Sequence, residues 1–122
     1  MDHHLLATKF LDAWTSQDVE AVLAVYTDDL RYRDPNTRGE IVGAAAFRRY
    51  LTRLFALWQM SWSLREVHIG PDGTGAVLWR ATMRRVGSGE TVHVEGMDLV
   101  QLRDGRVARN EVYFDRTLLA TA

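Results

Sequence analysis

Two carboxylates in this sequence occupy positions suited to proton transfer, and Asp98 is the more unusual of them. Side chains of a strand point alternately to its two faces. In "TVHVEGMDLVQL" (residues 91–102), Asp98 therefore shares one face with three valines, a glycine and a leucine. A carboxyl group in apolar surroundings either gains hydrogen-bond partners or has its pKa raised until it is neutral. Both states are useful for donating or accepting a proton at an active site.

A structural role is the alternative for Asp98. Its carboxylate would then pair with an arginine such as Arg80 or Arg109. A β-bulge would reverse the alternation and turn the side chain outward. The residues alone leave these alternatives open.

The second carboxylate, Asp34, ends the short run "LRYRD" and stands directly before a proline. Chemistry is often placed where a strand ends beside a pocket. The competing interpretation is a plain surface turn, because Asx–Pro pairs commonly begin one.

Three helices are predicted ahead of the main sheet. The first has an apolar stripe that runs from Leu6 to Trp14 at helical spacing. Asp18 suits the N-cap of a second helix, whose buried stripe ends at Tyr26. The stripe of the third helix ends at Trp58, with arginines on the opposite side. A short strand, residues 30–34, lies between the second and third helices.

After residue 58 the sequence changes to strands separated by glycine-containing turns. The turns are "GPDG", "GSGE" and "RDGR", where glycine permits the positive φ of a tight hairpin. The predicted strands are about 62–69, 75–86, 91–102 and 106–115. Short links make neighbouring strands antiparallel. We therefore expect one α+β domain, residues 1–122, in which helices cover one face of a curved sheet.

Such a sheet encloses space, and large aromatic residues fall on its expected walls. Each one alone is more simply explained as core, but together they indicate an apolar chamber for a small molecule. The expected lining residues are Phe10, Trp14, Tyr32, Phe55, Trp58, Trp62, Trp79 and Tyr113.

The segments "FLDAW", "DVEAVLAVYTDDLRYRDP" and "VEGMDLVQLRDGRVARNEVYFD" resemble the NTF2-like superfamily, and most closely its SnoaL-like branch. This branch includes polyketide cyclases and is related to ketosteroid isomerases and limonene-epoxide hydrolases. The resemblance implies a cone: a curved, mostly antiparallel sheet wrapped around a pocket that three N-terminal helices close. The scaffold serves many functions, so the resemblance indicates the fold more firmly than the reaction.

Position by position, the resemblance to ketosteroid isomerases places Asp34 at their general base. It places Asp98 at the neutral acid of their oxyanion hole. Phe10 falls where they have a tyrosine, and phenylalanine cannot donate that hydrogen bond.

The comparison with epoxide hydrolases argues against that reaction. Trp79, Ala81 and Val112 stand where that family needs an arginine and two aspartates. Tyr32 does match one of its tyrosines.

These comparisons lead to two hypotheses of different class. The first is a cofactor-independent acid–base enzyme of isomerase or cyclase type, with Asp34 and Asp98 as catalytic residues, that acts on an apolar carbonyl compound such as a polyketide, steroid or terpenoid. The second is a non-catalytic NTF2-like module that binds a lipophilic ligand or mediates protein association. Two carboxylates in one apolar cavity would favour the first.

The composition of the chain limits the classes of partner that it is expected to bind. The net charge is −1 and the basic residues are dispersed, which disfavours nucleic acid. The sequence has no cysteine and no run long enough for a membrane span, and the cytoplasm is the expected compartment.

His68 and His93 are isolated, so no metal site is expected. The convex sheet face, with Met97 and Leu99, predicts a homodimer formed through the sheet.

Overall fold

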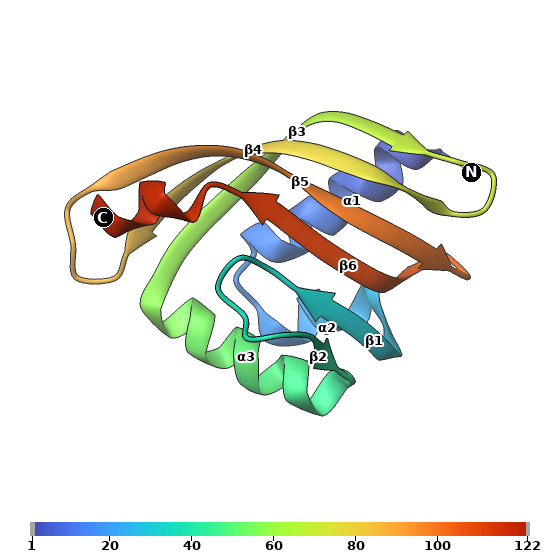
Figure 1. Cartoon of the computed structure of the whole chain (residues 1–122), viewed down its shortest axis with the longest axis horizontal. Helices are drawn as coiled ribbons and strands as arrows, with labels where there is room; N and C mark the ends of the chain where they lie inside the picture. Colours follow the sequence, from blue (N-terminus) through green and yellow to red (C-terminus); the bar gives the residue numbers. More distant parts are fainter. Residues whose placement is uncertain (1, 122) are drawn as a thin grey trace.

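The computed structural model describes residues 2–121 and contains one open, curved sheet of six strands with three α-helices (Figure 1). The strand order is β2-β1-β6-β5-β4-β3. All neighbouring strands are antiparallel except β1 and β6, which run parallel. The predicted α+β cone is confirmed.

The helices precede the long strands, as predicted. Their bounds are α1 His3–Thr15, α2 Val19–Ala24 and α3 Ala44–Leu57. Asp18 caps α2 and accepts hydrogen bonds from the backbone N–H groups of Glu20 (3.0 Å) and Ala21 (3.3 Å). The predicted ends of two helices were wrong, because Tyr26 begins β1 and Trp58 begins β3. Pairing with a neighbouring strand outweighs helical spacing at both positions.

β1 and β3 begin four residues earlier than predicted, and the other predicted strands lie within one residue of their expected bounds. Their bounds are β1 Tyr26–Arg33, β2 Ile41–Val42, β3 Trp58–Ile69, β4 Thr74–Arg85, β5 Thr91–Arg103 and β6 Arg106–Phe114, followed by the 3₁₀ helix η1 Arg116–Thr121. The three predicted hairpin turns join β3 to β6 in succession. No pattern had predicted the two-residue strand β2.

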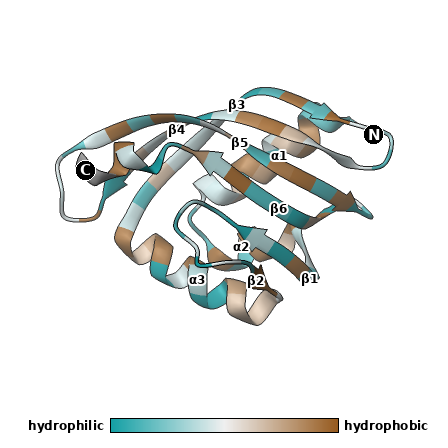
Figure 2. Cartoon of the chain, in the orientation of Figure 1, coloured by the Kyte–Doolittle hydropathy of each residue, from teal (hydrophilic) through white to brown (hydrophobic). Residues whose placement is uncertain are grey.

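Figure 1 shows β3, β4 and β5 arching over α1, while α3 lies near the other edge of the sheet, beside β1 and β2. Apolar and polar bands alternate along β5 and β6 in Figure 2, as expected for strands with one buried face. One end of the enclosed space is filled by the core side chains of Phe10, Val77, Val100 and Val107. The remainder stays open as the pocket described below.

None of the helices within residues 2–121 combines the length and hydropathy needed to cross a membrane.

Candidate active site

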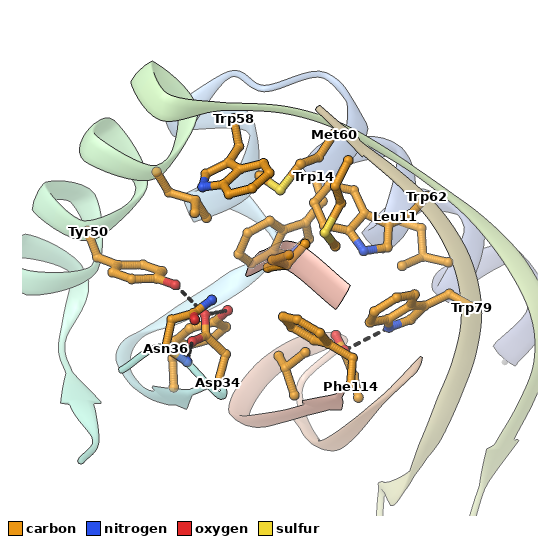
Figure 3. A pocket seen from close by; sticks show the side chains of 16 residues that line it. Leu11, Trp14, Asp34, Asn36, Tyr50, Trp58, Met60, Trp62, Trp79 and Phe114 are labelled. Carbon is orange, nitrogen blue, oxygen red and sulfur yellow. Dashed lines mark hydrogen bonds between the residues drawn. The ribbon is translucent and has the colours of Figure 1, made fainter. Parts of the chain in front are cut away.

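A pocket that is partly open to solvent lies between α3, η1 and the inner face of the sheet (Figure 3). Its walls are mainly aromatic and are contributed by α1, β1, α3, β3, β4 and β6. The aromatic lining consists of Trp14, Tyr32, Tyr50, Trp58, Trp62, Trp79 and Phe114. The polar lining is Asp34, Asn36 and Asp98, so both candidate carboxylates reach the same cavity.

Five of the eight expected wall residues line this pocket: Trp14, Tyr32, Trp58, Trp62 and Trp79. Phe10 and Phe55 do not. Phe10 is buried in the core against the ring of Tyr26, with ring centroids 5.8 Å apart. Phe55 packs edge-on against Trp14 at 6.0 Å. A helical stripe marks which residues are covered, but not which of them reach the cavity.

Tyr113 also lies outside the pocket, on the opposite face of the sheet. Neighbours on a strand alternate faces, and it is Val112 and Phe114 that line the cavity. The Tyr113 hydroxyl instead donates a hydrogen bond to Glu111 (2.6 Å). The sequence "VYF" contains two adjacent aromatic residues, and the prediction that Tyr113 rather than Phe114 lines the pocket was wrong.

Asp98 is buried on the pocket wall, with 5% of its surface exposed. Trp79 donates a hydrogen bond from its indole Nε1 to Asp98 Oδ1 at 2.9 Å, the dashed line beside Trp79 in Figure 3. Burial raises the pKa of Asp98 to about 7, against the opposing effect of hydrogen bonds from Trp79 and Asn110. The charge of Asp34 adds a smaller rise. Asp98 therefore exchanges its proton near neutrality.

The position of the Trp79 ring depends on Gly96. The two residues are paired across β4 and β5. A Cβ atom on residue 96 would lie 2.6 Å from Trp79 Cη2 and 2.7 Å from the backbone oxygen of Tyr113. Only glycine leaves room for the indole to lie over β5 and reach Asp98, two residues further along the same face.

A buried polar chain runs next to Asp98. Trp14 Nε1 donates to the Tyr26 hydroxyl (3.1 Å), which donates to Asn110 Oδ1 (2.7 Å). Asn110 has no exposed surface, and its amide nitrogen donates to the Leu99 carbonyl (3.3 Å). A buried network whose members are all bonded is rigid, so it fixes the side-chain amide that helps to set the pKa of Asp98.

Asp34 is held by four hydrogen-bond donors. Its Oδ1 accepts from the backbone N–H groups of Asn36 (2.7 Å) and Thr37 (3.1 Å). Its Oδ2 accepts from the hydroxyls of Tyr32 (2.8 Å) and Tyr50. One oxygen of Asp34 is thus held by the backbone of the turn, and the other accepts hydrogen bonds from two tyrosines on the pocket wall.

The two tyrosines that hold Asp34 remain protonated. Burial, followed by the charge of Asp34, raises the pKa of Tyr32 and of Tyr50 well above the usual range. Both hydroxyls therefore act as neutral donors at ordinary pH.

The arginine partners considered for Asp98 bind other acids. Arg80 Nε donates to Glu95 (3.1 Å) and Arg109 Nε donates to Glu111 (2.8 Å). Asp98 is therefore not part of an ion pair with either of them.

The sequence did not lead to three polar groups of the site, Asn36, Tyr50 and Asn110. Asn110 shares its strand face with Val112 and Phe114, which is the same signal that identified Asp98. Tyr50 follows Phe47 by three residues on α3, so helical spacing places it on the covered face. Across residues 2–121, no three His, Asp or Glu side chains gather closely enough to hold a metal ion.

The fold is similar to those of several solved proteins of low sequence identity. A protein from Bacillus subtilis that is provisionally assigned as an isomerase has a TM-score of 0.86 at 17% identity, with 100% of this chain and 95% of that one covered. SalBIII, an epoxide hydrolase/cyclase-like enzyme of pyran-ring formation in salinomycin, has a TM-score of 0.80 at 19% identity, with 93% of this chain and 91% of that one covered. A provisionally assigned SnoaL-like polyketide cyclase from Jannaschia sp. CCS1 has a TM-score of 0.77 at 22% identity, with 93% of this chain and 84% of that one covered.

Similarity at this level of identity establishes the fold alone. No functionally curated sequence matches the chain. The family model described as "SnoaL-like domain" matches residues 7–110, which include most of α1, the turn that holds Asp34, and the strand that carries Asp98. The chain therefore belongs to the SnoaL-like domain family.

Proposed function

We propose that the protein is a cofactor-independent acid–base enzyme of isomerase or cyclase type that acts on an apolar carbonyl compound, such as a polyketide, steroid or terpenoid. The supporting observation is the state of Asp98: a carboxyl group with a pKa of about 7 on the wall of an aromatic pocket. General acid–base catalysis is most efficient when the pKa of the catalytic group is near the working pH. The isomerase and cyclase assignments of similar folds support the same reaction class.

In this proposal Asp98 removes a proton from the carbon next to the substrate carbonyl and returns it at another position. Both steps are available to one group because a carboxyl with a pKa near neutrality is present in both forms at pH 7. The aromatic walls hold the substrate so that its carbon–hydrogen bond faces the Asp98 carboxylate.

Asp34 has a different role, as a positioning residue. Each of its oxygens already accepts two hydrogen bonds, which uses the lone pairs that a base would offer to substrate. It orients the hydroxyls of Tyr32 and Tyr50 on the pocket wall. The Asn36 side chain also lines the pocket, and its amide makes no hydrogen bond within residues 2–121; it supplies a donor for the carbonyl oxygen.

The test is proton exchange, which does not require the natural substrate. An apolar methyl ketone such as 2-acetonaphthone is incubated with the enzyme in D₂O, and deuterium next to the carbonyl is followed by NMR. The exchange rate of the wild type should rise with pH up to about 7 and then level off, because the ionised form of Asp98 is the base. Asp98→Asn should lose about 10²-fold or more of the enzyme-dependent rate.

The second function, a module that binds a lipophilic ligand, is favoured by the apolar lining and by the complete bonding of Asp34. The same experiment separates the two. Wild-type protein that binds the ketone but produces no exchange above the buffer rate at any pH would identify a binding module.

A further inference from the structure

The mouth of the pocket opens into a second, wider hollow that is continuous with solvent. The two cavities share Asn36, Tyr50, Leu54, Trp58 and Leu119, so a molecule in the pocket would extend into the outer space. We call this outer space the vestibule. Figure 3 shows Trp58 and Tyr50 on the α3 side of the pocket, where the two spaces meet.

All charged residues that line the vestibule are arginines: Arg38, Arg53, Arg85 and Arg116. They come from four separate elements, namely the β1–β2 connection, α3, the end of β4, and η1. Neither aspartate nor glutamate is among its lining residues. Four like charges converge on one opening in a chain whose net charge is −1.

These four arginines have no acidic partner within residues 2–121. Seven other arginines of the chain form ion pairs, with glutamates or with Asp29. The Arg85 guanidinium lies over the ring of Trp58, 5.7 Å from its centroid. Clustered guanidinium groups without counter-charges repel one another and create a positive potential that attracts an anion.

From this arrangement we infer that the natural substrate carries an anionic group, which the vestibule arginines bind while its apolar body occupies the aromatic pocket. The inference deepens the proposed function, because it describes the substrate of the same site. A carboxylate and a phosphate ester share the required chemistry, since both accept the paired N–H donors of a guanidinium.

Two fluorescent probes with the same aromatic body test the inference without any reaction. 1-Anilinonaphthalene-8-sulfonate is anionic, and N-phenyl-1-naphthylamine is its neutral counterpart. The wild type should bind the anionic probe about tenfold more tightly at about 20 mM salt, and this preference should decrease at about 500 mM salt because exposed charges are screened. Equal affinities for the two probes, with no effect of salt, would overturn the inference.

Variants then test whether the vestibule arginines cause the preference for the anionic probe. The double variant Arg53→Gln, Arg85→Gln should weaken binding of the anionic probe at least fivefold and change binding of the neutral probe less than twofold. Arg106→Gln is the matched control, because Arg106 is also exposed and outside any ion pair but begins β6 and does not line the vestibule. An equal loss in the control would contradict the role of the vestibule.

Competition against the bound anionic probe shows whether the anionic group of the substrate is a carboxylate or a phosphate ester. 2-Naphthoate, 2-naphthyl phosphate and 2-naphthol share one ring system. Preference for the naphthoate would support a carboxylic acid substrate, and preference for the phosphate would support a phosphate ester. If neither competes better than 2-naphthol, the inference is wrong. Probe binding does not depend on Asp98 catalysis, so absent proton exchange with intact probe preference would reject only the proposed function.

Discussion

The indole of Trp79 donates a 2.9 Å hydrogen bond to Asp98 across two neighbouring strands, β4 and β5. The bond joins the most deeply buried tryptophan of the pocket to its most perturbed carboxyl group. It is possible because residue 96, on the strand that carries Asp98, has no side chain.

Gly96→Ala should displace the Trp79 ring and weaken its bond to Asp98. The added methyl group would lie 2.6 Å from the indole and 2.7 Å from a backbone oxygen, and the backbone cannot give way easily. Overpacking of this kind costs about 1–3 kcal/mol of the free energy of unfolding. Denaturant unfolding measures the loss. Gly89→Ala is the control, because a Cβ atom there would meet nothing within 4 Å; an equal loss in both variants would contradict the explanation.

Asp98 should make the protein less stable as the pH rises from about 4 to 7. The folded protein holds this proton up to about pH 7, whereas the unfolded chain releases it near 3.8. Over this range the folded state binds more protons than the unfolded state, so the free energy of unfolding falls with pH. Between pH 5 and pH 8 the contribution is on the order of 3 kcal/mol.

Asp98→Asn removes the titrating group and should abolish that part of the pH dependence. Urea unfolding at pH 5 and pH 8 measures it for both proteins. The prediction fails if the variant and the wild type lose the same stability between the two pH values.

Glu111 should stabilise the folded protein at neutral pH and lose this effect in acid, which is the opposite pH dependence to that of Asp98. Hydrogen bonds from Tyr113, Arg33 and Arg109 lower its pKa to about 2. The stabilisation is therefore fully present above about pH 4.5 and is lost as the pH falls through 2. Glu111→Gln should cost on the order of 2 kcal/mol at pH 7, a value reduced because the arginines are half exposed. Acid unfolding followed by circular dichroism should show the difference shrink as the pH falls and disappear below pH 2; a constant difference at all pH values would exclude the ionic cause.

The two pocket aspartates should contribute unequally to proton exchange. Asp98→Asn removes the base, whereas Asp34→Asn changes only the orientation of Tyr32 and Tyr50. We expect the second variant to lose about tenfold of the rate and to keep the pH dependence of the wild type, with its midpoint moved slightly to lower pH. A larger loss in the Asp34 variant would reverse the assigned roles.

The sheet should also form a homodimer through its convex face. Met97 lies there opposite Leu78 on β4 and Tyr113 on β6, and 47% of Tyr113 is exposed. Met97→Glu should shift the protein to monomer in sedimentation equilibrium at micromolar concentration. A wild-type monomer under those conditions would contradict the prediction.

Much of this fold could be predicted from the sequence because local patterns determine it. Glycine turns defined the hairpins between β3 and β6, and alternation along 91–102 placed Asp98 on the inner face. The parallel pairing of β1 with β6 could not be predicted, since Tyr26 and its partner Val107 lie far apart in the chain.

Parts of the site depended on contacts that a single strand or helix does not reveal. The four donors of Asp34 include Tyr50 from a different element, and its contribution follows from how α3 packs beside β1. The assignment of Tyr113 failed because two adjacent aromatics fit the pocket equally well until the register of β5 and β6 is known. Conversely, Gly96 and Asp98 were already on one predicted face, but the indole that needs that glycine lies on another strand.

The most direct test of the account is the titration of the Asp98 carboxyl carbon by ¹³C NMR in the wild type, Trp79→Phe and Asp34→Asn. The wild type should titrate with a midpoint of about 7. The midpoint should rise in Trp79→Phe, which loses a hydrogen bond to the carboxylate, and fall in Asp34→Asn, which loses a neighbouring negative charge. A wild-type midpoint near 4, in the ordinary range of an aspartate, would contradict the claim that the pocket holds Asp98 ready to exchange a proton at neutral pH.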